Sequence, residues 1–244
     1  AHYNENSLGI KKLLKHSIRN NCKIIQGDLS NTDEIKKLWL EHVKWSRNKI
    51  DFLIDGPASF AKRAELIDNA QESIHLLTWT IYDDATGRDL AQRLVRRAKD
   101  GLDVRVIVDR NIAARGSHND TFKYMEDNGV KLIRWENPEH VQWGNHCKMM
   151  VVDGVQSVAG GMNPGDIYSH AWNVDARYEG QKWRDTDVYT TGPSVVEQEA
   201  LFVRYWNSQV QLQNLDHAPI SMNRAELLTR AGRPGNSKIA VVDH

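Results

Sequence analysis

Several features that would narrow the function of this 244-residue chain are scarce or missing. It has two cysteines, Cys22 and Cys147, and no CxxC pair, so neither a disulfide framework nor a cysteine-based zinc site is expected. Cys147 is expected to pack as a small apolar residue. The chain has no run of about 18 apolar residues, and its opening AHYNENSLGI lacks the apolar core of a signal peptide. We therefore expect neither a transmembrane helix nor an intact secretion signal.

The chain also has no net charge, since Lys plus Arg and Asp plus Glu each number 32. A protein that binds a long polyanion usually carries a basic surplus, so this balance disfavours nucleic acid as a partner without excluding it. The proportions of apolar and charged residues, 40% and 26%, are those of an ordinary globular protein. The length suits one large domain, or one domain and part of a second.

Strand-like and helix-like segments alternate through most of the chain. DVRVIVDR, residues 103–110, reads as a strand, and GRDLAQRLVRRAKDG, residues 87–101, reads as an amphipathic helix closed by Gly101. Strands that alternate with helices of roughly 10 to 16 residues predict an α/β domain, a mixed sheet between helix layers. The sheet should be mixed because residues 146–154 and 155–161 read as two strands joined by a tight turn, an antiparallel pair.

We expect three parts along the chain. Residues 1–48 are predicted to form a helical N-terminal extension, and residues 49–208 the α/β domain. Residues 209–244 are predicted to be a linker that ends in SKIAVVDH, an apolar run with the look of a strand. This run is interpreted as the start of a second half.

The stretch NHCKMMVVDGVQSVAGGMN, residues 145–163, carries the candidate chemistry. Side chains alternate along a strand, so His146 and Lys148 should share one face, about 7 Å apart, while Asp153 faces the other way. A lysine can neutralise a phosphate while a neighbouring histidine attacks it or passes it a proton. Asp153 is expected to act structurally, by fixing the turn or by binding nearby backbone groups.

A catalytic imidazole needs an acceptor that fixes its tautomer. Asp185 and Asp187 open the strand-like run DTDVYTT and share one face of it, so one of them is expected to reach His146. Gly160 and Gly161 allow a close turn, after which Asn163 can offer an amide N–H to a phosphate oxygen. No cluster of metal-ligand residue types stands out, so neither a metal nor a cofactor is expected.

This joint pattern resembles the HxKxxxxD signature of the phospholipase D superfamily. His146, Lys148 and Asp153 match its three defining positions, and GGMN, residues 160–163, resembles the family's Gly-[Gly/Ser]-x-Asn that follows it. WRDTDVYTTGP, residues 183–193, resembles the family strand that places Asp185 as the carboxylate supporting the histidine. The resemblance implies a metal-free phosphodiester reaction through a phosphohistidine. It assigns catalytic roles to His146, Lys148, Asp153 and Asp185, and phosphate binding to Lys148 and Asn163.

The family's active site uses two such motifs, and this chain carries one. One histidine becomes phosphorylated, and the other protonates the leaving alcohol. Single-motif nucleases of the superfamily form homodimers, whereas phospholipases and cardiolipin-synthase-like enzymes carry both motifs in one chain. We expect the chain to be one half of a pseudo-twofold, two-lobed enzyme, with the second motif in a C-terminal segment of the same protein or in a dimer mate.

The resemblance does not choose the substrate. Three features favour a phospholipid at a membrane surface: the zero net charge, the likeness of the motif to bacterial phospholipase D, and tryptophans near the motif. These tryptophans are Trp135, Trp143, Trp172 and Trp183. The expected reaction hydrolyses or transfers the phosphatidyl group. Two alternatives stay open: a homodimeric nuclease of the same superfamily, and an inactive lipid-binding or scaffold domain. The expected location is peripheral to a membrane or secreted.

Overall fold

The computed structural model describes residues 45–113, 119–140, 142–170, 180–239 and 241. The described residues from 45 onward belong to one compact unit. Trp172 and all but the last residues of the extension expected at 1–48 lie outside the described residues. Among the helices of the described ranges, none is long and apolar enough to span a bilayer.

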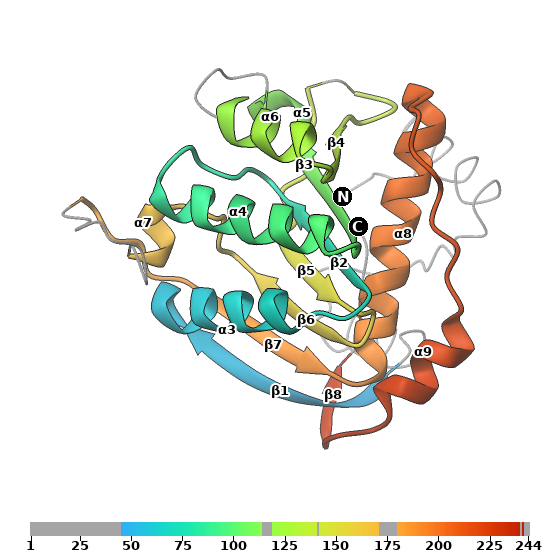
Figure 1. The fold of residues 1–244 in the computed structure, drawn as a ribbon. Coiled ribbons are helices and arrows are strands. Elements are labelled where there is room, and N and C mark those ends of the chain that lie inside the picture. Colours follow the sequence, from blue (N-terminus) through green and yellow to red (C-terminus); the bar gives the residue numbers. More distant parts are fainter. Residues whose placement is uncertain (1–44, 114–118, 141, 171–179, 240, 242–244) are drawn as a thin grey trace, which may run out of the picture. The chain divides into compact units, whose positions relative to one another are not determined.

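One mixed sheet organises this unit (Figure 1). Its eight strands lie in the order β4-β3-β2-β5-β6-β7-β1-β8. The neighbours β2, β3 and β4 run parallel, and every other neighbouring pair is antiparallel. The strands are β1 (Ser46–Ile54), β2 (Ser73–Thr78), β3 (Asp103–Asp109), β4 (Lys131–Trp135), β5 (Met149–Val152), β6 (Gln156–Gly160), β7 (Thr186–Thr191) and β8 (Ser237–Ile239). The predicted mixed α/β sheet is confirmed.

Helices cover both faces of the sheet. The described helices are α3 (Asp55–Asn69), α4 (Ala85–Lys99), α5 (Arg110–Ala113), α6 (Asn119–Asp127), α7 (Asp166–Ser169), α8 (Pro193–Gln213) and α9 (Arg224–Ala231). α3, α4 and α6 pack on one face, and α8 packs on the other. Alternate residues of one strand meet the two layers, because Leu76 belongs to the first core and Leu77 to the second.

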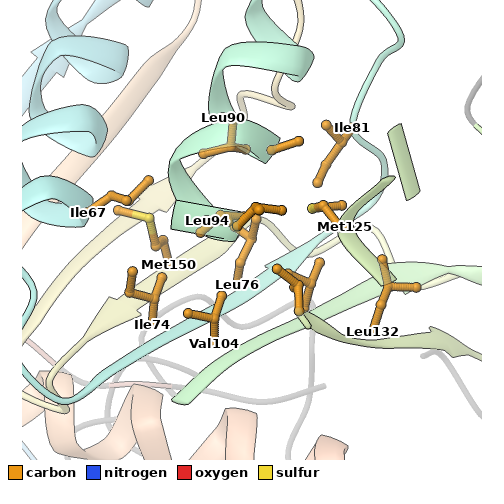
Figure 2. Close-up of a cluster of buried hydrophobic side chains, with 14 of the residues drawn as sticks. Ile67, Ile74, Leu76, Ile81, Leu90, Leu94, Val104, Met125, Leu132 and Met150 are labelled. Atoms are coloured by element: carbon orange, nitrogen blue, oxygen red, sulfur yellow. The ribbon is translucent and has the colours of Figure 1, made fainter. Parts of the chain in front are cut away.

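The first core joins α4 to the middle of the sheet (Figure 2). Leu90 and Leu94 lie one helical turn apart on the buried side of α4. They belong to the same buried cluster as Leu76, Val104 and Met150 of three neighbouring strands. Burying each such side chain contributes roughly 1.5–3 kcal/mol, so this cluster fixes the strands whose ends carry the candidate site.

The second core lies under α8, and the chain that follows this helix is tied down on the same side. Phe202 and Trp206 of α8 belong to the second buried cluster. The indole N–H of Trp206 donates to the carbonyl of Ala218 at 3.2 Å, and Asn207 exchanges hydrogen bonds with the backbone of Ile220 at 2.7 and 2.9 Å. Part of the segment expected as a linker is therefore held against α8.

The end of the described chain extends the sheet. Ser237–Ile239 form β8, which pairs antiparallel with the first residues of β1. These residues belong to the run interpreted from the sequence as the start of a second half. In the structure they complete one edge of the sheet already described.

Candidate functional site

The candidate site lies where three antiparallel strands in the middle of the sheet, β5, β6 and β7, bring distant segments together at one end of the strands (Figure 1). β5 and β6 pair Met149 with Ala159, and β6 and β7 pair Gly160 with Asp187. The residues before β5, after β6 and before β7 consequently meet. This register gathers the three sequence segments in which candidate residues were predicted.

His146 and Lys148 lie just before the strand and not inside it. β5 begins at Met149, although the sequence pattern predicted a strand from His146. The carbonyl of Lys148 still accepts the N–H of Gly160 at 3.2 Å, so the backbone remains close to β6. The prediction that Cys147 packs as an apolar residue is wrong: it is exposed, because it precedes the buried part of the strand.

The two side chains differ in exposure but share contacts. His146 is exposed, whereas Lys148 is 5% exposed. The ammonium of Lys148 donates to the carbonyl oxygen of His146 at 2.6 Å. Both face Trp79, directly after β2: its ring lies edge-on to the imidazole at 5.2 Å, and the ammonium stands 5.9 Å from the ring centroid. Trp79 thus packs against both groups.

Burial sets the protonation of both groups. Burial lowers the pKa of Lys148 to about 8, against the opposing charges of Cys147, Asp185 and Asp187. Partial burial and the nearby Lys148 charge lower the pKa of His146, against the pull of Asp109 in the other direction. A neutral imidazole is therefore favoured near neutral pH, and its free nitrogen lone pair is what a nucleophile or a general base needs.

The carboxylate of Asp187 is buried and hydrogen-bonded within the protein. Asp187 is fully buried, and its carboxylate accepts from the guanidinium of Arg63 at 2.9 Å, from the hydroxyl of Ser59 and from the N–H of Met162 at 3.4 Å. Arg63 is itself 2% exposed. This buried ion pair joins α3 to β7 beneath the candidate site.

Asp185 is partly exposed and stands at the candidate site itself. One carboxylate oxygen accepts the N–H of Thr186 at 2.7 Å. The other packs against Gly161, where an added Cβ would lie 2.3 Å away, so a side chain there would displace the carboxylate. Among the described residues, His146 makes no hydrogen bond to Asp185 or Asp187, whereas both carboxylates act electrostatically on Lys148.

Asp153 lies at the other end of β5 from Lys148. Its carboxylate accepts the backbone N–H groups of Gln71, Glu72 and Ser73 at 2.8–3.1 Å. It takes a positive φ of 52° in the turn between β5 and β6. These bonds anchor that turn, and with it the end of β5, to the start of β2.

Asn163, three residues after the end of β6, is fully buried. Its amide oxygen accepts from the hydroxyl of Thr78 at 3.3 Å, and its amide nitrogen donates to the hydroxyl of Tyr168 at 3.4 Å. Thr78 ends β2 and Tyr168 belongs to α7, so two elements orient the amide. Over the described ranges, no group of three or more His, Cys, Asp or Glu side chains gathers as a metal site.

Three residues of the site region were not predicted from the sequence. Trp79, Asp109 and Arg63 come from the end of β2, the end of β3 and the buried side of α3. Two signals were available. An acid closes the apolar run DVRVIVD, and an arginine occupies the buried stripe of an amphipathic helix.

Comparisons with known proteins agree with this geometry. Residues 64–177 match the family model described as "Cardiolipin synthase, PLD-like domain". Cardiolipin synthase A of Pseudomonas entomophila is 32% identical over 169 residues, which cover 66% of this chain and 34% of that protein. The major cardiolipin synthase of Bacillus subtilis is 28% identical over 226 residues, 87% of this chain and 45% of that protein. The chain thus spans less than half the length of these relatives.

Solved structures show the same fold. Phosphatidylserine synthase of Haemophilus influenzae superposes with a TM-score of 0.60 at 17% identity, over 87% of this chain and 52% of that one. Nuc from Salmonella typhimurium, a phospholipase D family member, gives a TM-score of 0.50 at 19% identity, over 67% and 95%. The fold and the sequence matches define a phospholipase D-like α/β domain. The chain belongs to the phospholipase D superfamily, and its matched segment is of the type described for cardiolipin synthase.

Proposed function

We propose that this chain supplies one catalytic half of a phospholipase D-type enzyme that transfers the phosphatidyl group of a phospholipid through a phosphohistidine on His146. The observation that carries the proposal is an exposed imidazole beside a buried ammonium, at the end of the central strands of a domain that matches cardiolipin synthases. The transfer takes place to an alcohol or, in hydrolysis, to water.

The proposed reaction has two displacements at phosphorus. The neutral imidazole of His146 attacks, an N–P bond forms, and the bond to the leaving alkoxide breaks. Lys148 and Asn163 stabilise the charge on the phosphoryl oxygens. An acceptor hydroxyl or water then attacks phosphorus and gives its proton to the group that protonated the leaving alkoxide, the N–P bond breaks, and His146 returns to its neutral form. Asp185, beside Lys148, completes the electrostatic surroundings.

The leaving alkoxide needs an acid, and we place it on a second HxKxxxxD motif outside this sequence. Lys148 faces the phosphate, where its charge is required. The curated relatives are more than twice as long as the segment they share with this chain. We therefore place the second motif in a further segment of the same protein, in preference to a second copy of this chain.

A phospholipid at a membrane surface is the proposed substrate, and the enzyme would work as a peripheral or secreted protein. Trp143 lies three residues before His146, and Trp183 lies two residues before Asp185. Their side chains are 59% and 42% exposed. Indole rings suit the boundary between lipid and water because they are apolar with one polar N–H. The relatives named cardiolipin synthase support a lipid substrate.

A homodimeric nuclease is the second candidate. The likeness to Nuc covers 95% of that structure. This chain carries a single HxKxxxxD motif, as expected for the homodimeric nucleases of the superfamily. The zero net charge speaks against it. The third possibility, an inactive lipid-binding or scaffold domain, is disfavoured by the intact His146, Lys148 and Asn163.

The test is covalent labelling of the complete protein by a phospholipid with a fluorescent acyl chain, followed by denaturing gel electrophoresis after a rapid quench. His146→Asn should lose the label and all turnover. His140→Asn, which changes another exposed histidine nearby, is the matched control and should keep both. Full turnover by His146→Asn would exclude the phosphohistidine, and turnover of DNA in place of lipid would favour the nuclease.

A further inference from the structure

We propose that Asp109 and Asn145 are positioning residues that hold His146 in the orientation for attack on phosphorus. This inference rests on the proposed nucleophilic role of His146. Neither residue belongs to the HxKxxxxD pattern, and Asp109 comes from a different strand.

Asp109 is a buried carboxylate that grips the segment just before His146. It ends β3 and is 1% exposed. Its Oδ2 accepts the backbone N–H of Asn145 at 2.7 Å, and its Oδ1 accepts that of Ile112 at 3.1 Å. The carboxylate packs so closely on Gly144 that an added Cβ would lie 2.8 Å from Oδ2. The backbone at 144–145 therefore has little freedom to move.

Asn145 holds the backbone on the other side of the histidine. Its side chain is buried, and its Oδ1 accepts the backbone N–H of Cys147 at 3.0 Å. The N–H groups of the residues before and after His146 are thus both held, and the carbonyl of His146 is held by the ammonium of Lys148. The backbone of the nucleophile is fixed, and the ring remains exposed to a substrate.

Asp109 also contacts Trp79, whose indole lies beside the imidazole ring of His146. Its backbone N–H donates to the carbonyl of Trp79 at 3.2 Å. The indole of Trp79 in turn meets the imidazole edge-on. One residue therefore couples the ends of β2 and β3 to the backbone and to the ring of His146.

The charge of Asp109 adds an electrostatic effect. Burial and Lys148 lower the pKa of His146, whereas the carboxylate of Asp109 raises it. The charged groups that face the imidazole are Lys148 and Asp109, and Asp185 and Asp187 act on Lys148. Neutralising Asp109 should consequently move the titration of His146 to lower pH.

The first experiment does not need catalysis. The imidazole of His146 is titrated by NMR in the 244-residue chain, with its signal assigned by its loss in His146→Asn. Asp109→Asn should lower the pKa of His146. Glu199→Gln neutralises another buried carboxylate, on α8 across the sheet, and should leave that pKa unchanged. An unshifted His146 in a folded Asp109→Asn chain would overturn the electrostatic part of the proposal.

The second experiment measures turnover in the complete, active protein. Asn145→Ala should lower kcat on the order of 10²-fold with little change in KM, because the nucleophile is misplaced and the substrate contacts remain. Asn145→Asp keeps the acceptor oxygen and should restore much of the rate. The double variant Asp109→Ala/Asn145→Ala should lose less than the product of the two single losses, since both act on one segment.

The outcomes separate the two proposals. If Asn145→Ala and Asn145→Asp are equally slow, or if the single losses multiply, the positioning role is wrong. If His146→Asn retains turnover, the proposed function is wrong, and the NMR result still decides whether Asp109 controls the imidazole. Thermal unfolding of each variant identifies any loss that comes from misfolding.

Discussion

Two aspartates of one short sequence run, Asp185 and Asp187, occupy different environments. Both belong to DTDVYTT, and by strand alternation they are equivalent. In the structure Asp187 is fully buried against Arg63, whereas Asp185 is partly exposed at the site. The difference arises because Asp187 lies within β7, where Arg63 of α3 covers it, whereas Asp185 lies just before the first residue of that strand.

This difference predicts opposite effects of the same substitution. Asp187→Asn leaves the Arg63 guanidinium buried and unpaired and should cost about 3–5 kcal/mol in the free energy of unfolding. Asp185→Asn should leave that free energy nearly unchanged and lower the rate of turnover. Urea unfolding together with kinetics of both variants checks this. A stable Asp187→Asn protein that is inactive would instead place Asp187 in the reaction.

The lowered pKa of Lys148 predicts an alkaline limit to activity. The ammonium is charged below its pKa of about 8 and loses its proton as the pH rises through that value. Because the phosphate contact requires the charge, kcat/KM, which reports the free enzyme, should fall above about pH 8. Lys148→Arg should be slow, since a planar guanidinium replaces a point charge, but it should not show this limit. The same alkaline limit in Lys148→Arg would assign it to another group.

At the scale of elements, a buried histidine joins β2 to α8. His75 is 3% exposed, stacks on Phe202 at 4.6 Å, and places Nδ1 2.8 Å from Oε1 of Glu199. Burial opposes the charged imidazolium, but the carboxylates of Asp103 and Glu199 outweigh it and raise the pKa of His75. This contact is an electrostatic link between the sheet and its largest covering helix.

The raised pKa predicts how stability changes with pH. The unfolded pKa is about 6.5, so the stabilisation by protonated His75 is fully present below that value. It is lost as the pH rises through the higher folded pKa. Glu199→Gln should flatten this decline in the free energy of unfolding as the pH rises above about 6.5. Parallel curves for the two proteins would show that His75 is not the group responsible.

At the scale of the whole molecule, β1 keeps large apolar side chains in contact with solvent. Phe52 and Ile54 are 66% and 60% exposed. They belong to the strand that runs antiparallel beside β7, next to the candidate site. Solvent exposure of two large apolar residues beside the site agrees with the proposed second lobe.

We predict that the 244-residue chain alone is a monomer without turnover. Adding a segment of the same protein that carries a second HxKxxxxD motif should restore activity, because it supplies the acid for the leaving alkoxide. Sedimentation and phospholipid turnover, with and without that segment, test this. An active homodimer of this chain alone would contradict it and would strengthen the nuclease alternative.

Much of the fold could be predicted from local patterns. The helix closed by Gly101 and the turn at Asp153 and Gly154 are present, and all three residues take positive φ. The start of β5 was predicted three residues too early, at His146, because apolar alternation does not show where backbone pairing begins.

The sequence by itself determined the mixed α/β architecture, the phospholipase D superfamily and the approach of His146 and Lys148, because these depend on periodicity and on a short fixed spacing. Only the tertiary structure decided which aspartate is buried, which backbone groups Asp153 binds, and that Asp109, Asn145 and Trp79 surround the histidine. The physical reason is that a strand's period assigns a side chain to a face, whereas its partners come from strands and helices far away in the chain. Those partners are chosen by sheet register and core packing, which no local pattern contains.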